Sequence, residues 1–325
     1  MASSDSRSSG KSDSGSGTSR AIVAALAANV GIAVAKFTGF VITGSAAMLA
    51  EAVHSMVDTA NQALLLLGQR AAAKAPDVLH PFGHGRSRYF WSFVVALVLF
   101  SLGSMFALWE GYGKVRHPVE LSSPVVAIAI LGIAILLETF SFRTALTESR
   151  PLKTEGSWLR FVHNSRNPEL PVVLLEDTAA LIGLALALAG VGLSVVTGNP
   201  VWDGVATLGI GALLGVVAVF LMVEMQSLLI GEGATTAEDQ AIRAALEGTE
   251  NVTRLIHIRT LYLGPDEMLV GAKIAVVPRL DLAGIAATID AAEVNIRAAV
   301  PAARVIYLEP DLDRTPVPDS LEQKG

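Results

Sequence analysis

The chain has 325 residues, of which 52% are hydrophobic and 17% charged, and its mean hydropathy is +0.52. These values favour a membrane protein over an ordinary soluble domain. The sequence contains no cysteine, so disulfides and thiolate ligands are excluded and any metal site must use His, Asp, Glu or backbone oxygen. The net charge of -6 averages over unlike regions, and no nucleic-acid partner is expected.

Long apolar runs follow a polar N-terminal segment. Residues 1–20 are mostly Ser, Gly, Asp, Lys and Arg and lack the apolar stretch of a signal peptide, which predicts a disordered cytosolic tail. The runs that follow have about the 20 residues that a helix needs to cross a bilayer. They predict an all-α transmembrane domain over 21–231 whose six spans lie at 21–43, 46–69, 88–113, 123–147, 170–197 and 201–230.

Basic residues in the connections predict the orientation of the spans, because Lys and Arg near span ends are retained on the cytosolic side. The N-terminal tail and the second and fourth connections are rich in them, whereas the first and fifth connections carry none. We therefore expect a multi-pass, lipid-embedded protein with both termini in the cytosol. Its high Ala and Gly content favours a bacterial inner (plasma) membrane.

From about residue 235 the sequence has the character of a small soluble domain. Thr236 and Asp239 can cap a first helix, and Gly264-Pro265-Asp266 is a turn signal between two strand-like runs. The elements expected are a helix over 236–247, strands over 252–263 and 268–277, a helix over 282–296 and a strand over 304–308. This αββαβ order predicts a cytosolic α+β domain over 235–311, followed by a flexible tail at 312–325.

Four polar residues interrupt the apolar pattern of the second span. Glu51, His54, Asp58 and Asn61 are spaced three, four and three apart, which places them on one face of a helix. Ionisable groups inside a membrane are costly and usually serve a site. Imidazole and carboxylate together suit zinc and its first-row neighbours, so His54 and Asp58 are expected to share a metal ion.

A tetrahedral metal site needs further ligands from another helix. Asp177 in the fifth span is the expected donor, with Glu176 beside it. The alternative is that these polar side chains only form hydrogen bonds between helices, which is the preferred reading for Asn61. Lys36 and Glu138 are expected to pair with each other or with helix ends and are assigned no role in binding.

A second cluster lies in the connection between the second and third spans. Asp77, His80 and His84 have the spacing of metal ligands, although Pro81 and Gly83 disfavour a regular helix there. A structured turn, whose histidines contact backbone or phospholipid, explains the same residues equally well. Both interpretations stay open.

At these residues the sequence resembles the cation diffusion facilitator family, the zinc-transporter-like metal and proton antiporters. The resemblance rests on the stretch from Gly44 to Asp58, on His80-Pro-Phe-Gly-His84-Gly-Arg86, on the span count and αββαβ order, and on the closing Tyr307-Leu308-Glu309-Pro310. It covers residues 21 to about 311. The triplet Leu175-Glu176-Asp177 resembles the signature of the branch of this family that contains the ninth human zinc transporter.

The resemblance implies transport sites built from paired residues in spans two and five, alternating access coupled to protons, and a homodimer with the soluble domains in contact. By position, His54 and Asp58 are the first pair and Asp177 is the second member of the other. The first member falls on Val173, where the family usually has His or Asp. Glu176, Asn61 or a water molecule could fill this place, and Glu176 should point about 100 degrees away from Asp177 around the helix.

The resemblance also assigns the loop site to Asp77, His80 and His84. In the soluble domain, the family's usual histidine positions fall on Ile256, Lys273 and Tyr307, and Lys273 would repel a cation. No binuclear metal site is therefore expected there, and the domain should serve dimerisation. Two weak candidates for a residual site are Glu309 and Asp311.

The leading hypothesis is a secondary transporter, not an enzyme, that exports a divalent metal from the cytosol in exchange for protons and has no cofactor besides its cargo. The donor types favour zinc, with manganese, iron, cobalt and nickel left open. A uniporter, a membrane-anchored metal sensor and a metal-dependent membrane enzyme are the alternatives. Against an enzyme, the sequence has no His-Glu-x-x-His motif.

Overall fold

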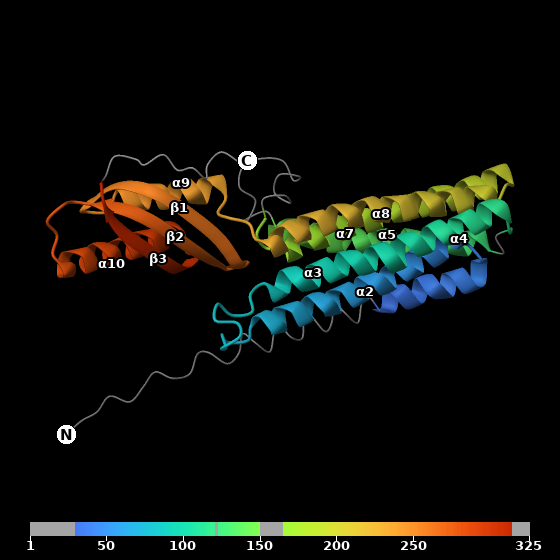
Figure 1. Cartoon of the computed structure of the whole chain (residues 1–325). Coiled ribbons are helices and arrows are strands. Elements are labelled where there is room, and N and C mark those ends of the chain that lie inside the picture. The colour runs from blue at the N-terminus through green and yellow to red at the C-terminus, as the bar shows by residue number, and fades with distance from the viewer. Residues whose placement is uncertain (1–29, 121–122, 150–164, 314–325) are drawn as a thin grey trace, which may run out of the picture. The chain divides into compact units, whose positions relative to one another are not determined.

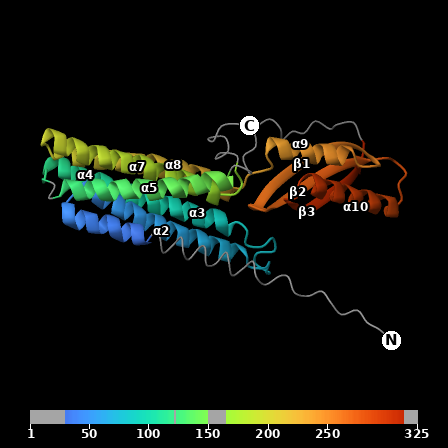
Figure 2. The ribbon, with the colours of Figure 1, turned by 180° about the vertical axis from the view of Figure 1, so that it is seen from behind.

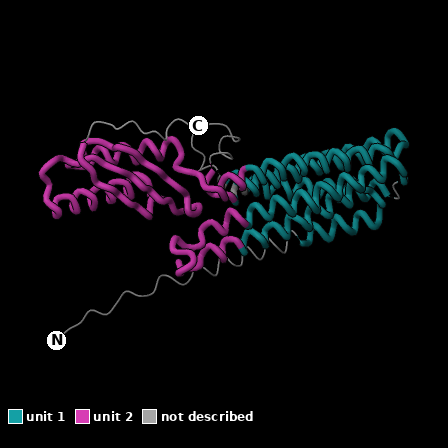
Figure 3. Tube along the Cα trace, viewed as in Figure 1, with its two compact units in different colours: residues 1–67, 91–156, 169–223 teal, residues 68–90, 157–168, 224–325 magenta. Residues whose placement is uncertain are grey.

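The computed structural model describes residues 30–120, 123–149 and 165–313. These residues form two compact units (Figure 3). The first unit takes its described residues from 30–67, 91–120, 123–149 and 169–223, and the second from 68–90, 165–168 and 224–313. Both predicted tails, except for residues 312 and 313, and the beginning of the first predicted span lie outside the described residues.

The first unit is helical (Figure 1). Its helices, several of which extend into the second unit, are Val30–Thr43, α2 (Ala46–Ala72), α3 (Ser87–Val98), the π-helical turn η1 (Leu99–Ser104), α4 (Met105–Arg116), α5 (Pro124–Ser149), α7 (Glu169–Thr197) and α8 (Val201–Ile230). Within the described ranges, four segments are long and apolar enough to cross a membrane: Ser87–Arg116, Pro124–Thr144, Pro171–Thr197 and Val201–Ile230.

These four segments coincide with four of the six predicted spans. The second predicted span corresponds to α2, whose 27 residues would reach across a bilayer but include the polar face described above. The first corresponds in its described part to the shorter apolar helix Val30–Thr43. A mostly helical membrane domain is thus confirmed, and the full count of six spans stays a prediction.

Close helix packing depends on glycine at several points. A Cβ atom on Gly39 would lie 2.3 Å from Met48 Cε and 2.7 Å from Ile130 Cδ1, so a larger residue here would force the side chains of α2 and α5 at this contact to shift. Helices α5 and α7 pack side by side in both views (Figures 1 and 2). Their apposition places polar residues of α5 against those of α7.

The start of α2 is held by a buried carboxylate of α8. Asp203 is 2% exposed, and it accepts hydrogen bonds from Ser45 Oγ (2.5 Å), from the backbone N–H of Ala46 (2.6 Å) and, more weakly, from that of Ala47 (3.4 Å). A helix leaves its first N–H groups without intrahelical partners and carries partial positive charge at that end. Asp203 therefore neutralises the N-terminus of the helix that carries the polar face.

The second unit contains a three-stranded sheet flanked by helices (Figure 1). The elements are α9 (Thr236–Glu247), β1 (Val252–Gly264), β2 (Glu267–Val276), α10 (Leu282–Ala299) and β3 (Ala303–Leu312). In the strand order β1-β2-β3, β1 pairs antiparallel with β2 and β2 pairs parallel with β3. The parallel pair requires a crossover, which α10 provides. A small α+β domain is confirmed, whereas its assignment as ferredoxin-like stays a prediction.

The helix caps differ slightly from the prediction. Thr235, one residue before the predicted cap, forms a capping box with Glu238; its hydroxyl accepts from the Glu238 N–H, and the Glu238 carboxylate accepts from the Thr235 N–H. Asp239 instead pairs with Arg243 on the helix surface. A Thr-Thr pair offers two cap candidates, and tertiary contacts select the first: Tyr262 Oη donates to Glu238 at 2.6 Å.

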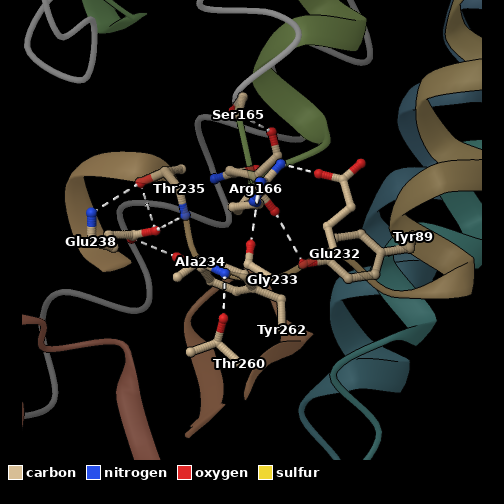
Figure 4. Close-up of polar contacts among 11 residues, drawn as sticks. Tyr89, Ser165, Arg166, Glu232, Gly233, Ala234, Thr235, Glu238, Thr260 and Tyr262 are labelled. Carbon is tan, nitrogen blue, oxygen red and sulfur yellow. Dashed lines mark hydrogen bonds and ion pairs between the residues drawn. The ribbon is translucent and has the colours of Figure 1, made fainter. Parts of the chain in front are cut away.

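Arg166 is the centre of a polar network in the second unit (Figure 4). Its guanidinium donates to the Glu232 carboxylate and, at 3.2 Å, to the Gly233 carbonyl, and it lies 5.7 Å from the ring centroid of Tyr262. Tyr89 Oη donates to the Arg166 carbonyl at 3.2 Å. These contacts join Arg166, which precedes α7, and Glu232 and Gly233, which follow α8, to strand β1.

Candidate cation-binding sites

The polar face of α2 brings His54 next to Asp58. The Nδ1 atom of His54 lies 3.5 Å from Asp58 Oδ1, which is longer than a good hydrogen bond. His54 is 1% exposed, yet among the described residues neither of its ring nitrogens has a hydrogen-bond partner, and the same holds for Asp58 Oδ1. Buried polar atoms are almost always satisfied. Free lone pairs on an imidazole and a carboxylate are the donors that a metal ion requires.

A cavity of about 30 Å³ opens beside these residues. This volume holds about two water molecules or one partly hydrated ion. Helices α2, α5 and α7 and the first helix all contribute to its wall. The lining residues are Ile32, Ser55, Asp58, Gln62, Glu138, Ser141, Val173, Glu176 and Asp177. Four carboxylates therefore face one small space within the helical bundle.

The two acidic residues of α7 both reach this cavity. Glu176 is 7% exposed and accepts a hydrogen bond from Asn61 Nδ2 at 2.6 Å. Asp177 Oδ2 accepts one from Ser141 Oγ of α5 at 3.4 Å. The predicted angle of about 100 degrees between neighbours on a helix does not separate them, because both residues line the same cavity. Asn61 has the expected role of an interhelical hydrogen bond.

Lys36 forms a buried ionic cluster next to the cavity. Its ammonium is 3.3 Å from Glu51 Oε2 and 3.9 Å from Glu138 Oε1, and it donates to Ser55 Oγ at 2.8 Å. Lys36 is 1% and Glu51 0% exposed. The expected pairing of Lys36 with Glu138 is present but long, and Glu51 is the nearer partner. Sequence reasoning did not find Glu51 in this role.

The predicted transport residues are thus only partly assembled. Asp58, Glu176 and Asp177 line one cavity, and His54 is held beside Asp58 without lining that cavity. Among the described residues, only one group of three or more His, Asp or Glu brings its ligand atoms within 4.8 Å of one another, and it lies in the loop between α2 and α3. A cation in the cavity would have to draw the α2 and α7 side chains together.

That loop group is Asp77, His80 and His84. His80 Nδ1 and His84 Nε2 each lie 3.2 Å from an oxygen of Asp77. The chain makes a turn in which the Gly83 N–H donates to the His80 carbonyl at 2.9 Å, with Pro81 in the position that proline favours and Gly83 at a positive φ of 79°. The residues that disfavour a helix are therefore the ones that build the turn.

Asp77 is the acceptor on which this turn depends. The backbone N–H groups of His80 (2.7 Å) and Leu79 (2.8 Å) both donate to its Oδ1 atom. Hydrogen bonding, above all from the His80 N–H and then from the two histidine rings, lowers the pKa of Asp77 to about 2. The carboxylate is therefore ionised throughout the neutral and mildly acidic range, which suits both a structured turn and a metal ligand.

The carboxylates at the end of β3 already have a cation between them. Lys273 Nζ lies 2.8 Å from Glu309 Oε1 and 3.2 Å from Asp311 Oδ2. Hydrogen bonds to Glu309 and then Asp311 raise the pKa of Lys273. The ammonium group occupies the position that a residual metal site on Glu309 and Asp311 would need.

Comparison with known proteins decides the family of the chain. A family model described as the cation efflux transmembrane domain matches residues 22–230. The chain belongs to the cation efflux family. This confirms the resemblance to cation diffusion facilitators, and the matched domain is one of transport, not of enzyme catalysis.

Several named proteins are similar to this cation efflux protein. The human mitochondrial proton-coupled zinc antiporter SLC30A9 is 35% identical over 231 residues, which are 70% of this chain and 41% of that protein. Metal tolerance protein C4 of Arabidopsis thaliana is 31% identical over 257 residues, 78% of this chain and 56% of that protein. The chain thus aligns with about half or less of these relatives' length. The matches confirm the prediction that the chain lies in the branch of the ninth human zinc transporter, SLC30A9.

Proposed function

We propose that the protein is a secondary transporter that exports a divalent metal ion, preferably zinc, in exchange for protons. The observation that carries the proposal is the intramembrane cavity lined by Asp58, Glu138, Glu176 and Asp177, with the unpartnered imidazole of His54 beside Asp58. Four carboxylates inside a membrane bundle are costly unless a cation or protons neutralise them. The human relative, named as a proton-coupled zinc antiporter, supports both cargo and counter-ion.

One site can serve both ions in turn. Metal binding requires neutral His54 and ionised Asp58 and Asp177, because protons compete for the same lone pairs. When the cavity faces the compartment with more metal, the metal displaces protons; when it faces the other side, protons displace the metal. Exchange then follows from mass action at a shared site. The mixed nitrogen and oxygen donors favour zinc over hard cations such as Mg²⁺, which prefer all-oxygen sites.

The transport ligands in this proposal are His54, Asp58 and Asp177, with Glu176 as a further oxygen donor. Asp77, His80 and His84 form a separate cation site in the loop, where Asp77 holds both imidazoles within 3.2 Å. Its exposure to solvent suits capture or sensing of metal ions. The soluble domain would serve to join two copies into a homodimer, and both termini would be cytosolic.

Flux measurements in sealed proteoliposomes test the proposal. Purified protein should exchange zinc that enters the vesicles for protons that leave them, so zinc uptake should be faster when the vesicle lumen is the more acidic side. A His54→Ala, Asp58→Ala double variant should lose this flux. Asp239→Asn, which removes an exposed carboxylate of α9 paired only with Arg243 in its own helix, is the matched control and should transport normally. Native zinc flux in the double variant would refute the site. A panel of manganese, iron, cobalt and nickel would rank the cargo.

A further inference from the structure

The wall of the transport cavity is apolar at the position where the family usually has a metal ligand. Val173 lines the cavity with Asp58 and Asp177, and its side chain cannot bind a metal ion. We propose that Glu138 of α5 supplies the missing oxygen, so that the cation site draws on a third helix. This inference rests on the proposed function and names an additional binding residue for it.

Helix packing brings Glu138 to the right face. Glu138 and Ser141 are three residues apart, so they lie on the same side of α5. Ser141 Oγ donates to Asp177 Oδ2 at 3.4 Å, and both α5 residues line the cavity. Since α5 packs along α7, Glu138 approaches the cavity from the helix next to the one that carries Val173.

The contacts of Glu138 leave its carboxylate available. Its ion pair with Lys36 is 3.9 Å long, which is at the outer limit for an ion pair. Glu138 has no other hydrogen-bond or ion-pair partner among the described residues. Lys36 is already engaged by Glu51 at 3.3 Å and Ser55 at 2.8 Å. A carboxylate has about four acceptor positions, so Glu138 keeps most of them free while 14% of its side chain is exposed.

Two further observations indicate that a ligand belongs here. His54 is fully buried with both ring nitrogens unpartnered, and Asp58 Oδ1 is also unpartnered. Hydrogen-bonded networks in protein interiors do not normally leave such atoms unused. A metal ion held by His54, Asp58 and Asp177 lacks one donor for tetrahedral coordination. Glu176 lines the same space but already accepts a hydrogen bond from Asn61 at 2.6 Å, whereas Glu138 is the loosely held carboxylate there.

Zinc titration of the full-length protein in detergent tests the role of Glu138. Glu138→Gln keeps the shape of the side chain but removes its charge, and it should weaken zinc binding at least about 10-fold, as loss of metal-supporting groups commonly does. The matched control is Glu110→Gln in α4, a carboxylate that does not line the cavity, which should bind zinc normally. Adding Val173→Asp to Glu138→Gln should restore tight binding.

The single variant Val173→Asp gives an independent answer that does not require Glu138→Gln to fold. If Glu138 already fills the fourth position, Val173→Asp changes zinc affinity less than about threefold; if the position is empty, the new carboxylate tightens binding at least about 10-fold. Tightening, or native affinity in Glu138→Gln, overturns the inference. Asp58→Asn separates the two proposals: if it too binds zinc natively, the transport site itself is wrong.

Discussion

The buried cap of α2 gives the sharpest prediction for stability. Asp203 accepts from the Ser45 hydroxyl and the Ala46 N–H at 2.5 and 2.6 Å, and it is 2% exposed. Asp203→Asn retains one acceptor oxygen but replaces the other with an NH2 group. If the amide oxygen faces Ser45, the NH2 group faces the Ala46 N–H, and two donors then oppose each other without water to separate them. The change thus removes a charge-assisted hydrogen bond at a helix N-terminus.

The magnitude follows from these contacts. A hydrogen bond to a charged group contributes about 1.5–3 kcal/mol, and an unsatisfied buried donor costs about 1–3 kcal/mol. In the opposite orientation the amide oxygen keeps the Ala46 N–H and the Ser45 hydroxyl rotates to accept from the NH2 group. The change then loses the charge assistance of two hydrogen bonds, about 1–1.5 kcal/mol each, and the interaction of the charge with the helix N-terminus, about 0.3–1 kcal/mol, a total of about 2–4 kcal/mol. At roughly 2–4 °C per kcal/mol for a domain of this size, the melting temperature should fall by roughly 4–16 °C. Ser45→Ala, which leaves both backbone contacts to Asp203 but removes a buried hydrogen bond to the carboxylate, should cost about 1.5–3 kcal/mol.

Thermal unfolding in detergent, followed by the loss of monodisperse protein on size exclusion, measures this effect. Asp239→Asn makes the same replacement of a carboxylate by an amide at the surface of α9. Its melting temperature should lie within about 1 °C of that of the wild type, since surface ion pairs contribute little. The same preparations should show lower zinc flux for Asp203→Asn, because His54 and Asp58 lie on the helix that loses its cap. A melting temperature equal to that of the control would refute the reasoning.

Three further changes test other parts of the molecule. Gly39→Val should destabilise the helical bundle by about 1–3 kcal/mol through overpacking, whereas Gly31→Val, where a Cβ meets nothing within 4 Å, should leave the melting temperature unchanged. Arg166→Gln should increase hydrogen exchange at Glu232–Thr235 because the network of Figure 4 loses its centre. Arg243→Gln, which removes a surface ion pair within α9, should not. Equal exchange at Glu232–Thr235 in the two variants would contradict the role of Arg166 in the network. Since the pKa of Asp77 is lowered to about 2, its stabilisation of the loop is complete above the ordinary carboxyl pKa near 4 and is lost as the pH falls through about 2. Pepsin should therefore cleave the loop faster in Asp77→Asn than in the wild type at pH 4, and the ratio of the two cleavage rates should approach one near pH 2. A ratio that stays constant between pH 4 and pH 2 would contradict the stabilising role of the Asp77 carboxylate.

Much of the α+β domain was predictable because its signals are local. Alternating apolar residues and the turn at Gly264-Pro265-Asp266 predicted β1 and β2 to within about one residue at each end. The cap moved from Thr236 to Thr235 since the choice between two neighbouring threonines depends on where Glu238 can meet Tyr262. A sequence pattern does not contain that distant contact.

The transmembrane site was predictable only along single helices. The spacing of His54 and Asp58 placed both on one face of α2, as the structure has them. The depth of Glu138 in the cavity and the pairing of Lys36 with Glu51 depend on how three helices rotate against one another. Apolar periodicity does not determine that rotation in a span that is hydrophobic on nearly all sides. The cap between Ser45 and Asp203 joins residues 158 positions apart and was missed for the same reason.

Charge balance in the bundle connects the cavity to the proposed exchange. The carboxylates that line the cavity or pair with Lys36 are Glu51, Asp58, Glu138, Glu176 and Asp177, and Lys36 is the one ammonium that pairs among them in the described structure. One lysine offsets a single negative charge, so the remaining acids must bind protons or a cation to stay inside a membrane. A divalent ion displaces about two protons from such a set. The lysine therefore offsets Glu51, its nearer partner, and in the proposed exchange Asp58, Glu138, Glu176 and Asp177 are left to alternate between metal and protons.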